Sequence, residues 1–247
     1  MRHQTPGVAI VGGGFGGVGA AIAMRRAGVR DLVLFERAER LGGVWHHNTY
    51  PGAACDVPSS LYSYSFARNP GWSRRFSGGS EIRRYLENCA DRFGVLDAVR
   101  TGVDVISATW DDERALWHLK TSEGEHEARV LICACGQLTT PNVPEIEGIE
   151  DFAGPVFHSA RWRHDVDLTG TRVAVIGTGA SAIQFVPAIA PSVRALHVFQ
   201  RSAPWILPKP DRAYRAWENR LFERLPAVQQ ADRFALWAFF EASVPGF

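Results

Sequence analysis

Two glycine-rich turns carry the strongest chemical signal in the 247-residue sequence. The first is Gly12-x-Gly14-x-x-Gly17, which follows the apolar run 7–12. In this spacing the first glycine permits a tight turn, the second lets backbone amides approach a pyrophosphate, and the third lets a helix pack on a strand. Glu36 ends the next apolar run, where its carboxylate can accept hydrogen bonds from ribose hydroxyls. The pattern predicts a dinucleotide site.

The second turn repeats this plan later in the chain. Gly177-x-Gly179-x-x-Ala182 follows the apolar run 172–176, and a second strand is expected over 195–200. The third position holds alanine, the other small residue that the dinucleotide pattern accepts. The repeat predicts a second nucleotide site on the same chain.

The residues that end the two second strands assign a nucleotide to each site. The first strand ends in Glu36-Arg37, and the second ends in Gln200-Arg201. Without a carboxylate nothing repels a 2′-phosphate, and Arg201 can pair with it. We therefore expect FAD at the first site and NADPH at the second, with ordinary surface placement of Arg201 as the alternative.

The elements that position these motifs alternate between short apolar strands and helices. After the first glycine turn we expect a helix over 18–27 and a strand over 31–36, and a later helix over 80–93. Strands expected to form a small antiparallel meander cover 102–109, 116–121 and 128–135. The sequence therefore predicts an α/β fold with two Rossmann-like dinucleotide-binding units, the first of which contains the meander.

Four segments follow from this pattern. We expect an FAD-binding domain over 1–140, a linker over 141–170, the start of an NADPH-binding domain over 171–210, and an amphipathic helical segment over 211–247. Pro226 divides the last segment into two helices.

Composition excludes several other classes of protein. A formal net charge of +1 gives no electrostatic reason to expect nucleic acid as a partner. The uncharged run 4–24 is too rich in glycine for a transmembrane span or a secretory signal. Four cysteines without a C-x-x-C spacing predict neither a metal site nor a disulfide framework, and they fit inert thiols in a reducing cytoplasm.

The segment after Glu36 shows which class of flavin enzyme the sequence fits. A disulfide reductase needs a redox-active dithiol near the flavin, and residues 41–47 contain none. Two longer motifs stand instead at Gly43-x-Trp45-x4-Tyr50-Pro51-Gly52-x3-Asp56 and at Phe152-x-Gly154-x3-His158-x3-Trp162. These motifs and essentially all of residues 7–210 resemble the Baeyer–Villiger monooxygenases, a family of single-component flavin monooxygenases.

The resemblance implies which residues contact the cofactors. Glu36 would bind the adenosine ribose of FAD, Val44, Trp45 and Tyr62 would line the flavin, and Val105 would meet the adenine through its backbone. The remaining implied cofactor contacts are Gly12, Gly14, Gly17, Arg37 and Gly43 for FAD, and Gly177, Thr178, Gly179, Ser181, Ala182, Gln184, Arg201 and Ser202 for NADPH.

The same resemblance implies three residues that act in catalysis. Asp56 would lie near the isoalloxazine, where a carboxylate can orient a cation and influence protonation of the oxygenated flavin. Its alternative is to cap the turn after Pro51-Gly52. His158 and Trp162 would link domain movement to catalysis, with a hydrogen-bonded hinge and interdomain packing as their alternative roles.

The implied reaction uses both nucleotides and O2. NADPH would reduce FAD, and the reduced flavin would form a C4a-peroxide that converts a small ketone to an ester or lactone. Transfer of oxygen to nitrogen or sulfur is the alternative. In the family, an active-site arginine and a returning flavin segment come from later sequence that is not here, so we expect a fragment. Its helical segment 211–247 would meet a missing C-terminal half, with a partner protein or a membrane surface as the alternatives. A bare nucleotide-binding module and a shortened NADPH oxidase or flavin reductase are the other hypotheses.

Overall fold

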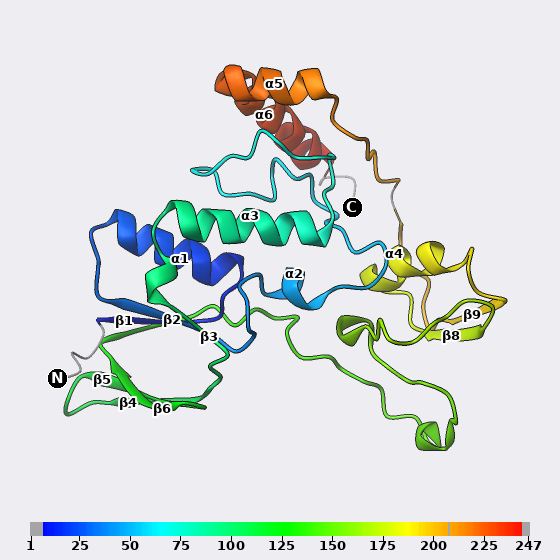
Figure 1. Cartoon of the computed structure of the whole chain (residues 1–247), viewed down its shortest axis with the longest axis horizontal. Coiled ribbons are helices and arrows are strands. Elements are labelled where there is room, and N and C mark those ends of the chain that lie inside the picture. Colours follow the sequence, from blue (N-terminus) through cyan, green and yellow to red (C-terminus); the bar gives the residue numbers. More distant parts are fainter. Residues whose placement is uncertain (1–6, 207, 244–247) are drawn as a thin grey trace. The chain divides into compact units, whose positions relative to one another are not determined.

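A computed structural model describes residues 7–206 and 208–243, and its contacts divide the chain into two compact units (Figure 1). Unit 1 contains the described residues up to Asn48 together with Ile82–Glu147. Unit 2 contains Thr49–Glu81 and the described residues from Gly148 onward. No helix in the described ranges is long and apolar enough to cross a membrane.

Unit 1 is built on a four-stranded parallel sheet in the order β3-β2-β1-β7. The strands are β1 (Val8–Val11), β2 (Leu32–Glu36), β3 (Val99–Thr101) and β7 (Val130–Cys133). The two central strands, β1 and β2, are short apolar runs, as expected for parallel strands that are covered on both faces. Ile10 and Leu34 accordingly have no exposed surface.

Helices α1 and α3 both bury apolar side chains in unit 1. α1 (Phe15–Arg26) connects β1 to β2, and α3 (Gly79–Arg92) begins close to the predicted position. Ile22 of α1 and Leu86 of α3 are fully buried. A single helical turn, α2 (Val44–His47), follows the first strand–helix–strand unit. The predicted Rossmann-like architecture is confirmed for this unit.

The meander of unit 1 differs from the prediction in its last strand. It consists of β4 (Val105–Asp111), β5 (Leu116–Thr121) and β6 (Gly124–Ala128), all antiparallel. The predicted third strand, 128–135, is wrong, because its apolar part is β7, which pairs in parallel with β1. The polar sequence of β6 concealed a strand of the meander, whereas the apolar sequence of β7 extends the parallel sheet at its edge, beside β1.

Unit 2 repeats the strand–helix–strand plan on a smaller scale. β8 (Arg172–Ile176) and β9 (Ala195–Phe199) are parallel, and α4 (Ala180–Ile189) connects them. α4 continues through Pro187, which lies inside the helix. Short 3₁₀ turns cover Leu96–Ala98 in unit 1 and Ile149–Asp151 and Ser159–Arg161 in unit 2.

The last described helices of unit 2 are α5 (Ala216–Arg224) and α6 (Pro226–Ser243). Pro226 is the first residue of α6, a position where proline costs nothing because that amide has no partner within the helix. The predicted pair of helices around Pro226 is confirmed.

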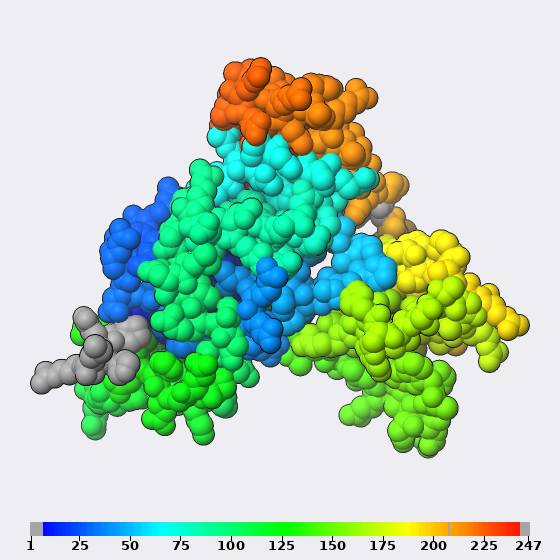
Figure 2. Space-filling model, viewed as in Figure 1, coloured from blue at the N-terminus to red at the C-terminus, as the bar shows by residue number. Residues whose placement is uncertain are grey.

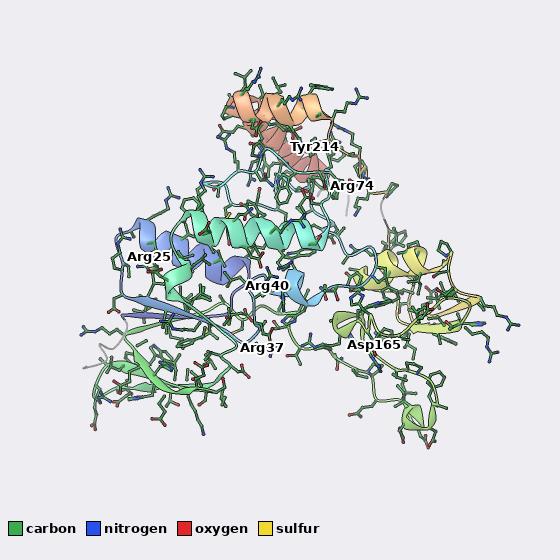
Figure 3. All side chains as sticks on the ribbon, viewed as in Figure 1. Arg25, Arg37, Arg40, Arg74, Asp165 and Tyr214 are labelled. Atoms are coloured by element: carbon green, nitrogen blue, oxygen red, sulfur yellow. The ribbon has the colours of Figure 1, made fainter. Side chains whose placement is uncertain are left out.

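Polar contacts hold α6 and the chain that precedes α5 to residues 49–81 of the same unit. Arg74 forms an ion pair with Asp211 at 2.8 Å, and Gln229 Nε2 donates to the carbonyl of Asn69 at 2.7 Å. Figure 2 shows the orange helix α5 packed over this cyan segment, and Figure 3 labels Arg74 at the contact. The sequence pattern places this segment within the expected FAD-binding domain over 1–140. The difference arises because its anchors are polar side chains far apart in sequence, which no local pattern indicates.

Close packing of α1 on β1 depends on Gly17. A Cβ built at Gly17 would lie 1.7 Å from the carbonyl oxygen of Gly12 and 3.5 Å from Ile10 Cγ2. The contacted oxygen belongs to the backbone, so no rotamer change can relieve the clash. The third glycine of the motif is therefore required by main-chain packing, as the spacing predicts.

We predict that Gly17→Ala lowers the free energy of unfolding by about 3 kcal/mol, because the backbones of the turn and helix must separate. Urea denaturation followed by circular dichroism measures the change. Gly16→Ala is the matched control, since a Cβ there meets only Ala134 Cβ at 3.5 Å and alanine favours the helix. Equal stability of the two variants would contradict the packing argument.

Candidate functional site

The carboxylate of Glu36 closes the first glycine turn. Gly13 N donates to Glu36 Oε2 at 2.6 Å, and Ala38 N donates to Oε1 at 2.8 Å. The residue is 6% exposed. Each carboxylate oxygen accepts one of these backbone hydrogen bonds and retains a further lone pair. Glu36 is thus oriented at the end of β2 with acceptor capacity for another donor.

The first two glycines of the turn have no space for a side chain. Gly12 has φ +107°, and a Cβ there would lie 2.4 Å from the carbonyl oxygen of Ala134. A Cβ at Gly13 would lie 2.6 Å from Leu41 Cδ2. Gly14 precedes α1 without a side-chain capping bond, so the first amides of that helix are available to an anion.

The beginning of the Gly43–Asp56 motif lies against this turn. Gly42 N donates to the carbonyl of Gly13 at 2.9 Å, and a Cβ at Gly43 would lie 3.0 Å from Gly14 Cα. Val44 and Trp45, the residues implied to line a flavin, begin α2 directly after this contact. The structure therefore brings these predicted residues beside the first glycine turn.

Two other predicted residues of unit 1 lie at its borders. Arg37 donates through Nη2 to the carbonyl of Thr139 at 3.2 Å. Val105 is the first residue of β4 and packs on the core that contains Phe35. The amide of Val103 bonds the carbonyl of Glu36 at 3.0 Å, which ties the start of the meander to the end of β2.

In unit 2 the two long motifs meet on α4. The rings of Tyr50 and Trp162 both contact Phe185, with centroid separations of 6.1 and 5.3 Å. His158 Nδ1 accepts the amide of Ala160 at 3.0 Å and caps the short 3₁₀ turn. Trp162 thus packs in the core of unit 2, and the hydrogen bond of His158 to the Ala160 amide is a local cap.

The second glycine turn has free space where side chains would be at its two glycines. Gly177 has φ +105°, and neither Gly177 nor Gly179 has an atom within 4 Å of a built Cβ. Ala182 is 8% exposed in the core of the unit. The other residues implied for NADPH are Thr178, Ser181 and Gln184, all half-buried, and Arg201 and Ser202, both exposed in the segment after β9.

Asp56 and Tyr62 also belong to unit 2. Asp56 is exposed, whereas Tyr62 is half-buried and its amide bonds the carbonyl of Pro58 at 2.8 Å. Among the described residues no cluster of three His, Cys, Asp or Glu side chains could hold a metal ion.

Sequence reasoning missed three elements of this arrangement: the Gly13 amide that Glu36 accepts, the partner of Gln184, and the docking role of Arg74. The run of three glycines at 12–14 could have indicated the contact between Gly13 and Glu36. A glycine at the centre of such a run indicates that a neighbouring backbone or carboxylate lies too close for a side chain. Nothing local signals the other two.

A family model described as "Pyridine nucleotide-disulphide oxidoreductase" matches residues 9–230. The chain belongs to this family. Its four cysteines are all free in the structure.

Individual relatives agree with the resemblance inferred from the motifs. A protein named Baeyer-Villiger monooxygenase from Streptomyces coelicolor is 50% identical over 99% of this chain and 47% of its own length. The structure also matches oxidized steroid monooxygenase bound to NADP, with TM-score 0.81, 41% identity, and coverage of 90% of this chain and 43% of that one. A complex of OTEMO with FAD and NADP matches with TM-score 0.82 and 32% identity, covering 91% of this chain and 45% of the other. The likeness to Baeyer–Villiger monooxygenases is confirmed, and the chain spans about half the length of the relatives it matches.

Thiol accessibility gives a test of the packing around the proposed site. Burial raises the pKa of Cys55, which directly precedes Asp56, to about 11, and burial also raises the pKa of Cys89. Cys133 and Cys135 are exposed. We predict that an aromatic disulfide reagent at about pH 8 labels the two exposed thiols quickly and the two buried ones only after denaturation. Peptide mass spectrometry identifies the labelled thiols, and fast labelling of Cys55 would contradict the fold of this segment. As the control, the double variant Cys133→Ser/Cys135→Ser should have no fast phase.

Proposed function

We propose that the chain binds FAD at the first glycine turn and NADPH at the second, and that it forms the cofactor-binding part of a flavin monooxygenase. The observation that carries the proposal is the turn at Gly12–Gly14, in which a Cβ at Gly12 or Gly13 would clash and which is tied to Glu36 by the Gly13 amide. Such a turn brings backbone amides against a diphosphate, and the spare lone pairs of Glu36 suit ribose hydroxyls.

The second turn suits a phosphorylated nucleotide. Gly177 and Gly179 leave space around the N-terminus of α4, and Arg201 is exposed just beyond β9. An exposed guanidinium without a neighbouring carboxylate at the strand end can form a bidentate contact with a 2′-phosphate. This arrangement supports NADPH over NADH.

The names of the relatives and the motif residues favour oxygenation of a small ketone with O2, giving an ester or lactone. FAD, when bound, supplies electron transfer from NADPH to O2. In the proposed division of work, the glycine turns bind the nucleotides, Val44 and Trp45 line the flavin, and Asp56 holds a cation or proton beside it. Oxygenation of an amine or a sulfide is the alternative that the motifs leave open.

One observation favours a second candidate, a cofactor-binding module that turns over only with a further polypeptide segment. Within the described residues the unit 2 sheet has two strands, and Ile176, Val198 and Phe199 on them are 60%, 43% and 57% exposed. Apolar side chains and unpaired strand edges of this kind are usually covered in soluble proteins.

The proposed function is tested by adding NADPH to the FAD-loaded chain without oxygen and then admitting air. We expect the yellow flavin absorbance to disappear on reduction and to return on exposure to O2. Flavin that stays oxidised at saturating NADPH would contradict the assignment of the second site. Reduction without oxygenation of any ketone, amine or sulfide would favour the module over the complete enzyme.

Arg201→Ala tests the nucleotide preference in the same assay. Loss of a charge-assisted contact is expected to weaken NADPH binding about tenfold or more, while NADH binding changes little. Arg194→Ala is the matched control, because Arg194 is also exposed but precedes β9 instead of following it. An equal loss for both nucleotides would exclude a 2′-phosphate contact at Arg201.

A further inference from the structure

The side-chain amide of Gln184 pairs with the main chain of Ala54 within unit 2. Gln184 Nε2 donates to the carbonyl of Ala54 at 2.8 Å, and Ala54 N donates to Gln184 Oε1 at 3.2 Å. The hydroxyl of Tyr50 donates to the same oxygen at 3.0 Å. The side chain of Gln184 thus makes the two hydrogen bonds to the main chain of Ala54 that a neighbouring β-strand would otherwise make.

This network fixes the orientation of the amide. A flipped amide would present N–H groups to the Ala54 amide and the oxygen to the Ala54 carbonyl, which leaves both main-chain groups unsatisfied. In the observed orientation the oxygen of Gln184 accepts two hydrogen bonds and so uses both of its lone pairs. A nucleotide can meet only the second N–H of Gln184.

The turn that Gln184 holds also packs tightly on α4. Gly52 has φ +81°, and a Cβ there would lie 2.9 Å from the backbone carbonyl oxygen of Gln184. Tyr50 is 7% exposed in the core that contains Phe185. Both the side chain and the main chain of α4 therefore contact the turn.

The ends of the held segment have further anchors. Thr49 Oγ1 lies 2.9 Å from His164 Nε2, and Ala54 forms an isolated antiparallel bridge with Gly78. Asp56 follows two residues later and is exposed. The Tyr50–Ala54 turn and its contacts with Gln184, His164 and Gly78 therefore fix the main chain just before Asp56.

We propose that Gln184 is a positioning residue that holds the Tyr50–Ala54 turn, and with it Asp56, on the helix that follows the second glycine turn. This role differs from the nucleotide contact that the sequence implies for Gln184. It rests on the proposed function, in which the second turn takes NADPH and Asp56 serves the flavin. The clamp connects the nucleotide-binding helix to the segment that carries the reacting carboxylate.

Hydrogen exchange at the Ala54 amide tests the clamp without any cofactor. Gln184→Met removes all three hydrogen bonds and is expected to speed this exchange about tenfold, whereas Tyr50→Phe leaves both Ala54 bonds in place and has a smaller effect. Ile183→Met, at a 41% exposed neighbour on α4, is the matched control and should leave the rate unchanged. Unchanged exchange at Ala54 in Gln184→Met overturns the proposal.

Cofactor measurements separate positioning from nucleotide contact. We expect Gln184→Met to keep the affinity for NADP+ within about twofold of the unaltered chain. The same variant should slow flavin reduction by NADPH about tenfold. In the Asp56→Asn background, adding Gln184→Met should cause no further slowing. A tenfold loss of NADP+ affinity, or slowing that persists in Asp56→Asn, overturns the proposal. If the unaltered chain binds neither cofactor, the proposed function fails, and exchange at Ala54 still decides whether the clamp exists.

Discussion

The contact between the Gly12 carbonyl and the backbone of Gly17 sets the geometry of unit 1. Because no Cβ intervenes, the first turn of α1 lies directly on the end of β1. The helix therefore starts immediately after the strand, with its uncapped amides beside the glycine turn. The Gly13 amide can then reach Glu36 at the end of the neighbouring strand. One steric condition thus produces both the uncapped helix end and the orientation of the Glu36 carboxylate, the two features to which we assign the diphosphate and the ribose.

The second turn has the same spacing in a different environment. In unit 1 the residues after β7 press on Gly12, whose built Cβ would lie 2.4 Å from Ala134 O. At Gly177 no atom lies within 4 Å of the corresponding position. The described part of unit 2 has no strand on that side of β8, so its turn is less confined. The helix that follows this second turn, α4, contacts the Tyr50–Ala54 turn through Gln184.

The sequence was sufficient for the features that depend on local pattern. Glycine spacing and apolar runs predict β1, α1 and β2, and the same pattern predicts β8, α4 and β9. Prediction failed where the deciding contact is distant. The partner of β7 depends on a vacant edge of the parallel sheet, and the inclusion of residues 49–81 in unit 2 depends on polar anchors such as Arg74 with Asp211. The acceptor role of Gln184 depends on Ala54, 130 residues earlier in the chain.

We propose that the first glycine turn, closed by Glu36, holds FAD. The most direct measurement is a fluorescence titration of FAD with the purified chain, compared with Glu36→Gln and with Glu39→Gln, an exposed carboxylate nearby. We predict one FAD bound per unaltered chain, the same affinity for Glu39→Gln, and affinity about ten- to a hundredfold weaker for Glu36→Gln, because hydrogen bonds to a charged acceptor are lost. No binding by the unaltered chain, or equal binding by both variants, would contradict the account.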